Sequence, residues 1–348
     1  MARKPSIRDV AEAAGVSVGT VSHYLNDRSV SKVRADRIKK AIMDLGFTSN
    51  ALARGMRSQK STVIGLCAPF TTFSNFSTLV DELEQNVSEA NFEVMQVLSR
   101  HDPEREMVRV RRLADYKVRG MLLIPSFKPQ QMLDFLYKVE IPTVIINRVM
   151  PEETRFDQVG VDHRGQTREI ASRLIEEGHR SITFVARYPD LDLTRQRIDG
   201  LRDAVSASGQ DVELEFIACG DVSSDYRDTL TKRLKSKDRP SYLILSNSRI
   251  AIWSVEVVRA ANIEIGILTL DHPEWAEFVE PRISFVRQPN VEIAALAWRC
   301  LSERIENLDE MPKTILLNAR IEWLNLSAPS LEAGKHAGIR KPVPAKKD

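Results

Sequence analysis

Residues 6–22 read SIRDVAEAAGVSVGTVS and predict two short helices joined by a tight turn. In the first half of this run, apolar residues recur at helical spacing, and the small Ala11 allows a second helix to cross closely. Ser6 and Asp9, three residues apart, are typical of a capping pair at the start of a helix. Gly15 supplies the backbone freedom that the turn needs.

A second helix is expected from a cap at Ser17 to about Leu25, and a third from a cap at Ser31 to about Leu45. The residues of the third helix that are expected to face inward are Ile38, Ala41, Ile42 and Leu45. Two short helices around a glycine turn, supported by a third helix, form a helix-turn-helix.

Charge is unevenly distributed along the chain, although the formal net charge is only +2. Residues 1–60 carry a net +7, residues 331–348 carry +3, and residues 61–330 carry −8. A basic head on an acidic body indicates that only the head meets a polyanion such as DNA. A solvated basic arm would give the same pattern, so charge alone does not decide between them.

Composition narrows the class of protein. The 348 residues are enough for two or more domains. No apolar run approaches the ~18 residues of a membrane span, and residues 1–5 do not lead into a secretory signal. The three cysteines, Cys67, Cys219 and Cys300, are far apart in the sequence, which argues against a disulfide framework and fits a reducing compartment. We therefore expect a cytoplasmic protein with no membrane partner.

From residue 61 onward the pattern alternates between strand and helix, which predicts parallel α/β sheets. Strands are expected at 62–66, 92–97, 120–124, 143–146, 181–185, 214–218, 242–245 and 265–270. Helices are expected at 79–90, 105–116, 130–139, 166–177, 197–208, 227–235, 250–261 and 291–307. So long a region is large for one sheet, and we expect two subdomains with a ligand cleft at the carboxyl ends of their strands.

The run at 6–22 closely resembles the DNA-reading signature of the lactose-repressor/galactose-repressor family, and residues 50–57 (NALARGMR) resemble its hinge helix. Three core segments also match that family in type and order: 178–180 (GHR), 197–200 (RIDG) and 287–289 (RQP). The resemblance spans about residues 6–328. It implies a transcription regulator, of the repressor type, that binds a pseudo-palindromic operator in double-stranded DNA as a homodimer. A small effector in the core would switch it.

The fold that the resemblance implies is a small all-α helix-turn-helix head joined to an α/β core. This core has two parallel-sheet subdomains and is similar to a periplasmic binding protein. The expected divisions are a DNA-binding domain at 1–47, a hinge helix and linker at 48–60, an effector-binding and dimerisation core at 61–330, and a disordered basic tail at 331–348. Within the core, the N-subdomain is expected at about 61–160 and 291–320, and the C-subdomain at about 161–290 and 321–330.

The second helix is expected to lie in the major groove. Val18 and Gly19 occupy the specificity positions of the family, and His23 stands where the family usually has arginine. The full DNA-binding set is expected to be Ser6, Ser17, Val18, Gly19, Thr20, Ser22, His23, Asn26, Asn50, Ala53, Arg54, Met56 and Arg57. Core packing of Val18, and helix capping by the serines and Thr20, are the alternatives.

The hinge helix, capped by Asn50, is too short to be stable alone in water and is expected to fold on the operator. Met56 stands at the position from which the family inserts a leucine into the minor groove, and it is apolar and flexible enough to do the same. Arg54 and Arg57 would lie near phosphates. A plain linker is the alternative.

The resemblance places Arg197 in the cleft, where its guanidinium can grip hydroxyls or a carboxylate. Asp271 follows a strand and is expected to accept hydrogen bonds from sugar hydroxyls. The full effector-binding set is expected to be Phe70, Thr71, Phe73, Phe76, Asn147, Arg148, Arg197, Asn247, Asp271 and Gln288. The expected ligand is a sugar or a sugar derivative. The alternatives are core packing for Phe73 or Phe76, and for Arg197 an ion pair with Asp199 or another neighbour.

Two other classes of function were weighed. Residues 15–19 (GVSVG) match the nucleophile elbow of hydrolases, but a helix and not a strand precedes them. There is no phosphate loop or HExxH, and the six histidines lack metal-ligand spacing. We therefore expect no enzyme, no catalytic residue, no cofactor and no metal. A regulator whose core docks a protein partner remains the alternative.

Overall fold

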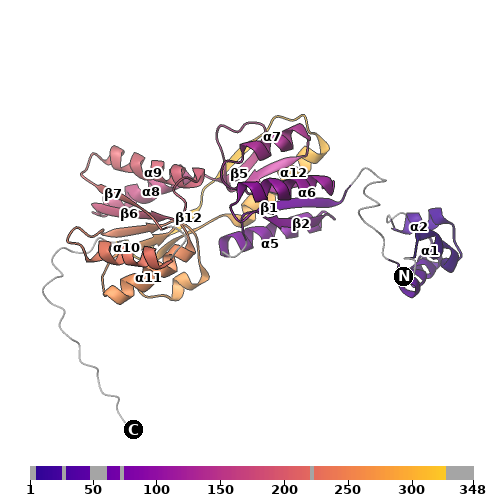
Figure 1. Cartoon of the computed structure of the whole chain (residues 1–348), viewed down its shortest axis with the longest axis horizontal. Helices are drawn as coiled ribbons and strands as arrows, with labels where there is room; N and C mark the ends of the chain where they lie inside the picture. The colour runs from indigo at the N-terminus through magenta and orange to yellow at the C-terminus, as the bar shows by residue number, and fades with distance from the viewer. Residues whose placement is uncertain (1–4, 26–28, 48–60, 71–73, 220–222, 327–348) are drawn as a thin grey trace, which may run out of the picture. The chain divides into compact units, whose positions relative to one another are not determined.

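The computed structural model of the chain describes residues 5–25, 29–47, 61–70, 74–219 and 223–326. It divides into two compact units, residues 1–62 and residues 63–348 (Figure 1). No helix among the described residues is long and apolar enough to cross a membrane.

The described residues of the first unit form three helices: α1 (Ile7–Ala14), α2 (Val18–Leu25) and α3 (Lys32–Leu45). Its small core is formed by Val10, Ala11, Ala14, Val21, Ile38 and Ala41. Gly15 ends α1 at φ +62°, a backbone conformation that favours glycine, and the predicted turn is therefore present.

The capping predictions for the first unit are confirmed in part. The Asp9 carboxylate accepts hydrogen bonds from both the backbone N–H and the hydroxyl of Ser6, at 2.6 and 2.7 Å. The Ser17 hydroxyl accepts one from the Thr20 backbone N–H at 3.1 Å. Ser31 is the N-cap residue of α3 as predicted, although its side chain makes no cap hydrogen bond. The inward orientation predicted for Leu45 was wrong, because this last residue of α3 lies at the exposed end of the helix.

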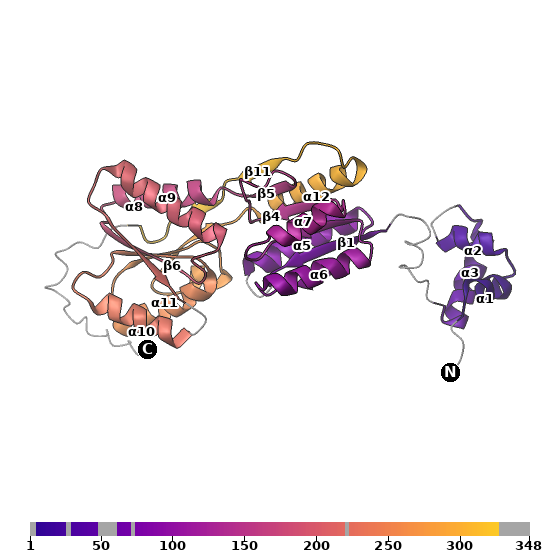
Figure 2. The ribbon, with the colours of Figure 1, turned by 45° about the horizontal axis from the view of Figure 1, so that its top comes forward.

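In the second unit, the part of the chain that the structure describes forms two six-stranded sheets (Figures 1 and 2). The first sheet defines the N-subdomain and is parallel throughout, in the order β2-β1-β3-β4-β5-β11. Its strands are β1 (Val63–Ala68), β2 (Glu93–Leu98), β3 (Gly120–Leu123), β4 (Thr143–Ile146), β5 (Asp157–Val161) and β11 (Thr314–Leu317). Its helices are α5 (Ser74–Glu89), α6 (Pro103–Asp115), α7 (Gln130–Lys138) and α12 (Asn290–Glu306). Side chains of α5 and α12 form the core on one face, and those of α6 and α7 form the core on the other.

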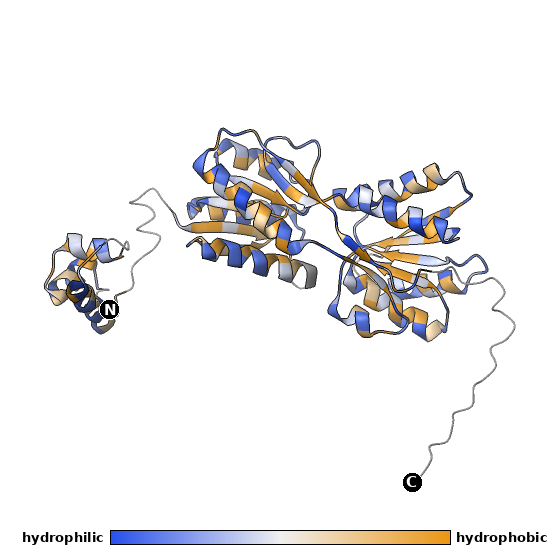
Figure 3. Cartoon of the chain, turned by 180° about the vertical axis from the view of Figure 1, so that it is seen from behind, coloured by the Kyte–Doolittle hydropathy of each residue, from blue (hydrophilic) through white to orange (hydrophobic). Residues whose placement is uncertain are grey.

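The second sheet defines the C-subdomain, in the order β7-β6-β8-β9-β10-β12, with β12 antiparallel to β10. Its strands are β6 (Ser181–Ala186), β7 (Glu213–Ala218), β8 (Tyr242–Leu245), β9 (Gly266–Thr269), β10 (Ser284–Arg287) and β12 (Arg320–Glu322). Helices α8 (His163–Glu176) and α9 (Asp192–Ser208) cover one face. The other face is covered by α10 (Ser223–Lys235), α11 (Ser248–Ala261) and the short 3₁₀ helix η1 (Glu274–Phe278). Figure 3 shows apolar strands in both sheets between helices with polar outer faces.

The chain passes between the two subdomains after β5, after β10 and between β11 and β12. These crossings lie near residues 162, 289 and 318, at one side of both sheets. The carboxyl ends of the parallel strands of both sheets therefore face a common space between the subdomains.

Candidate functional site

The DNA-reading residues predicted on α2 lie mostly at its surface. Ser17, Val18, Gly19 and His23 are exposed, whereas Val21 of the same helix is fully buried. A Cβ atom added at Gly19 would meet only the Ser17 hydroxyl, at 3.7 Å, so packing within the head does not require glycine there. The core-packing alternative for Val18 is therefore wrong, because its side chain is 42% exposed.

Ser6, Thr20 and Ser22 are partly buried at the edges of the same unit. The Ser17 and Thr20 hydroxyls lie 2.9 Å apart, so capping already engages both. The other predicted DNA-binding residues lie outside the described residues: Asn26, Asn50, Ala53, Arg54, Met56 and Arg57.

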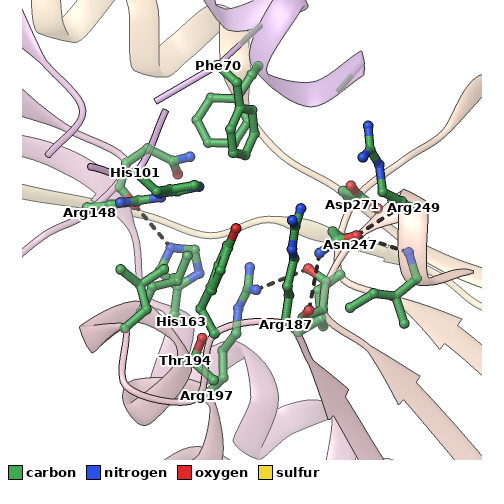
Figure 4. A pocket seen from close by; sticks show the side chains of 18 of the residues that line it. Phe70, His101, Arg148, His163, Arg187, Thr194, Arg197, Asn247, Arg249 and Asp271 are labelled. Carbon is green, nitrogen blue, oxygen red and sulfur yellow. Dashed lines mark hydrogen bonds between the residues drawn. The ribbon is translucent and has the colours of Figure 1, made fainter. Parts of the chain in front are cut away.

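A pocket opens between the two subdomains of the core (Figure 4). It holds about 890 Å³ of space, including the part open to solvent. Many of its lining residues lie one or two positions after a strand: Phe70 lies beyond β1, Arg148 beyond β4 and Asp271 beyond β9. Helices α8 and α9 also contribute to the wall, with His163 at the start of α8 and Arg197 in the second turn of α9.

Eight of the ten predicted effector residues line this pocket: Phe70, Phe76, Asn147, Arg148, Arg197, Asn247, Asp271 and Gln288. The other two, Thr71 and Phe73, lie outside the described residues. Core packing is thus not the only role of Phe76, which packs against the N-subdomain core and also lines the pocket.

Arg148 is the most enclosed cation of the N-subdomain wall. It is 7% exposed, and its guanidinium donates hydrogen bonds to the Pro125 carbonyl and to Nδ1 of His101. Burial lowers the Arg148 pKa to about 10, and nearby Glu106 partly opposes this effect. Its Nε has no partner among the described residues.

Arg197 is the corresponding cation of the C-subdomain wall. It is 7% exposed and donates to the Ser246 carbonyl at 3.2 Å. Burial lowers its pKa to about 10, and nearby Asp271 partly opposes this effect. The proposed ion pair with Asp199 is wrong, because Asp199 lies 3.8 Å from Arg202 and Arg197 faces the pocket.

The polar side chains after β8 and β9, those of Asn247 and Asp271, already accept hydrogen bonds from within the protein. The Asn247 side-chain oxygen caps α11 by accepting from the backbone N–H groups of Arg249 and Ile250, both at 3.1 Å. The Asp271 carboxylate accepts from the Ser248 N–H and the Thr269 hydroxyl, both at 2.8 Å, while burial raises its pKa. Both side chains therefore stabilise the wall of the pocket in addition to lining it.

Several lining residues were missed by the sequence analysis: His101, His163, Arg187, Tyr188, Arg249 and Trp253. Arg187 and Tyr188 come directly after β6, and the strand-end rule would have found them had it been applied to that strand. His163 carried no such signal, since α8 begins three residues before its predicted start.

The aromatic residues form a cluster that joins the two subdomains. His101, after β2, has its ring centroid 4.8 Å from that of Phe70 and 5.0 Å from that of Tyr188. Tyr188 also lies 5.3 Å from Phe127, in an edge-to-face arrangement. A second contact crosses the cleft where the Gln196 side chain donates to the Val149 carbonyl at 3.0 Å. These contacts connect the two subdomains across the pocket.

Comparison with known proteins covers both units. Residues 6–50 match the family described as bacterial regulatory proteins, lacI family, and residues 171–323 match the periplasmic binding protein-like domain. The chain belongs to the LacI family.

Relatives match this LacI-family chain over nearly its full length. It is 26% identical to the HTH-type transcriptional regulator KdgR of Bacillus subtilis, over 91% of this chain and 96% of that protein. It is 25% identical to the HTH-type transcriptional repressor PurR of Vibrio atlanticus, over 92% and 99% respectively. A crystal structure of the Lac repressor dimer bound to operator and the anti-inducer ONPF has a TM-score of 0.80 at 18% identity, covering 94% of this chain and 100% of that one.

These matches confirm the predicted fold class of a helix-turn-helix head and a core with two periplasmic-binding-protein-like subdomains. The relatives are transcription regulators and not enzymes. This LacI-family chain is accordingly a DNA-binding transcription regulator.

Proposed function

We propose that this regulator represses transcription in the cytoplasm by binding a pseudo-palindromic operator as a homodimer, and that a sugar or sugar derivative in the core pocket switches it. The observation that carries this proposal is the pocket itself, which collects eight predicted effector residues from both subdomains. Ligands of parallel α/β proteins bind at this edge of the sheet.

The domain division proposed for this function is the one expected from the sequence: head 1–47, hinge 48–60, core 61–330 and tail 331–348. Exposed Val18, Gly19 and His23 on α2 support major-groove contact by the head. For the hinge we propose that Met56 enters the minor groove while Arg54 contacts phosphates.

An apolar patch on the C-subdomain supports the homodimer. Ile252 of α11 is exposed, and Phe278 of η1 is 89% exposed close to Trp275 and Val279. Exposed apolar patches of this kind mark protein interfaces. The Lac repressor structure cited above is also a dimer. A chain that ends at residue 330 should therefore sediment as the same oligomer as the full chain; a smaller assembly would show that the tail holds protomers together.

The switch follows from the position of the pocket. A ligand that touches Arg148 in one subdomain and Arg197 in the other favours one relative orientation of the two. In a dimer, a change in that orientation alters the separation of the two points near residue 61 at which the hinges join the core. Because such short helices are marginal alone, small displacements decide whether they form on DNA.

The test begins with selection of binding sites from random DNA by the full chain. Residues 61–348 alone should not retain the selected DNA at moderate salt, because the basic head provides the phosphate contacts. Specific binding by residues 61–348 would overturn the assignment of the head. If the core instead docks a protein, no small molecule will raise its thermal unfolding midpoint.

A further inference from the structure

Positively charged side chains outnumber negatively charged ones in the lining of the pocket. Four of its lining residues are arginines: Arg148, Arg187, Arg197 and Arg249. Asp271 is the only carboxylate that lines it within the described part of the chain. Figure 4 shows Arg187 and Arg197 extending from the C-subdomain into the middle of the pocket, with Arg148 on the opposite wall.

The two enclosed arginines lack strong counter-charges. Arg148 and Arg197 bond to neutral carbonyl groups, and each guanidinium has a buried Nε with no partner among the described residues. The acids near them, Glu106 and Asp271, are themselves buried, which raises the pKa of each. Glu106 is also held by the Ser126 backbone N–H and hydroxyl, both at 2.8 Å. Buried cations without matched anions are costly, so a ligand that brings negative charge stabilises this arrangement.

Two histidines indicate a second property that the ligand needs, namely hydrogen-bond donors. Arginine can only donate hydrogen bonds, so Nδ1 of His101 accepts from Arg148 and the ring is neutral. His163 donates from Nε2 to the Asn147 carbonyl, which leaves its Nδ1 as a buried acceptor with no partner in the described structure. The Gln288 side-chain oxygen is a second such acceptor, because its nitrogen donates to the Leu270 carbonyl. Acceptors of this kind require donors such as ligand hydroxyls.

We propose that the effector of this regulator is a hydroxylated anion, whose carboxylate or phosphate is held by the arginines and whose hydroxyls meet His163 and Gln288. The inference rests on the proposed function and narrows its ligand class from sugars in general to sugar acids or sugar phosphates. Aromatic faces at Phe70 and Tyr188 suit the apolar side of a sugar ring.

The test uses calorimetry and thermal unfolding of the full chain at constant ionic strength. Its probes are matched pairs, galacturonate with galactose and glucose 6-phosphate with glucose, together with inorganic phosphate as the bare oxyanion. We expect binding by at least one anionic probe and weaker or no binding by its neutral partner. Preference for galacturonate identifies a carboxylate ligand, and preference for glucose 6-phosphate identifies a phosphate ligand.

The basic head also attracts phosphate. Variants of pocket residues therefore test whether the anionic probe binds in the pocket. Arg187→Gln and Arg197→Met should each weaken the binding of the preferred probe about tenfold or more. Arg187 is only partly buried, whereas Arg197 is buried, so the Arg187 variant keeps the test valid if Arg197→Met does not fold. The matched control is Arg195→Gln, two residues from Arg197 on the solvent side of α9, with a side chain that is 59% exposed. It should bind as wild type does.

The inference is overturned if neutral sugars bind and their acids and phosphates do not, if no anionic probe binds at millimolar concentration, or if Arg187→Gln and Arg195→Gln behave alike. Failure of the proposed function is a different result, namely a ligand that binds the pocket without changing the affinity for DNA.

Discussion

The ring of Tyr188 in the C-subdomain lies 5.0 Å from the ring of His101 in the N-subdomain, so an aromatic contact connects the two halves of the core across the pocket. Tyr188 packs against Phe127 of the N-subdomain as well. Burial and the nearby cation Arg148 lower the pKa of His101 to about 3, and the neutral ring is suited to aromatic packing.

Tyr188→Ala should shift the ligand-free core toward more open arrangements. Aromatic pairs contribute about 0.5–1.5 kcal/mol each beyond their buried area, so loss of two pairs should change the open-to-closed ratio by about tenfold. Small-angle X-ray scattering should show a larger radius of gyration for the variant. Tyr116→Ala, at an exposed position after α6, is the control and should scatter as wild type does. Equal scattering by Tyr188→Ala and wild type would show that the aromatic contact does not hold the subdomains together.

Val18 and Val21 form a matched pair on α2, one exposed and the other fully buried in the core of the head. Val21→Ala should lower the free energy of unfolding of the head by on the order of 1–3 kcal/mol. Val18→Ala should leave that stability unchanged and weaken or alter binding to selected operator DNA. Chemical denaturation and DNA-binding titrations measure the two effects. A Val18 variant with unchanged operator preference would remove Val18 from the reading surface.

Gly200 on α9 fixes the close approach of α9 to α8. A Cβ atom there would overlap the Arg164 carbonyl oxygen and the Thr167 hydroxyl. Gly200→Ala should destabilise the core by on the order of 2 kcal/mol, even though alanine favours a helix more than glycine does. Ser206→Ala, on the exposed side of the same helix, is the control for the denaturation experiment. A Gly200→Ala chain as stable as wild type would contradict the close packing of α8 and α9.

Elements that are marked by consecutive residues could be predicted from the sequence, whereas elements that depend on distant partners could not. Strand β8 was predicted with its observed bounds because four consecutive apolar residues at 242–245 form it. Strand β5 was missed because it begins with two buried polar residues, Asp157 and Gln158. The Asp157 carboxylate is satisfied by Arg304, 147 positions away, and no local pattern predicts such a partner.

The same distinction holds for the pocket. Positions directly after strands, such as Arg148 and Asp271, were predictable from topology. Residues that enter from helix starts were harder to predict, because α9 begins at Asp192, five residues before its predicted start, and thereby brings Thr194 into the wall. The pairing of aromatic rings across the cleft depends on two distant loops and could not be read from sequence spacing.

The stability of the core should fall on mild acidification because of His163. Burial lowers the pKa of His163 to about 3, with repulsion from Arg197 as a smaller cause. The unfolded chain, with a histidine pKa of about 6.5, therefore binds a proton that the folded chain excludes. The loss is on the order of 1 kcal/mol at about pH 5.5 relative to neutral pH, since stability falls wherever the unfolded state binds more protons.

Denaturation of wild type and His163→Gln across this pH range measures that effect. The difference between the two profiles isolates the histidine from Glu106 and Asp271, whose raised pKa values act in the opposite direction as pH falls. The glutamine amide can replace the Nε2 donor to the Asn147 carbonyl and does not titrate. Parallel profiles for the two proteins would show that His163 does not resist protonation in the folded state.

The most direct test of the account is the affinity of the full chain for its selected operator, measured by fluorescence anisotropy while a pocket-binding sugar acid or sugar phosphate is titrated. Saturating ligand should change the affinity for DNA by about 5- to 150-fold, the usual range of allosteric coupling. Arg197→Met should lose this change. Without ligand, the variant should still bind the operator if the ligand is an inducer, and should bind it only weakly if the ligand is a corepressor. A ligand that saturates the wild-type pocket by calorimetry, and leaves the affinity for operator DNA the same, would contradict this coupling.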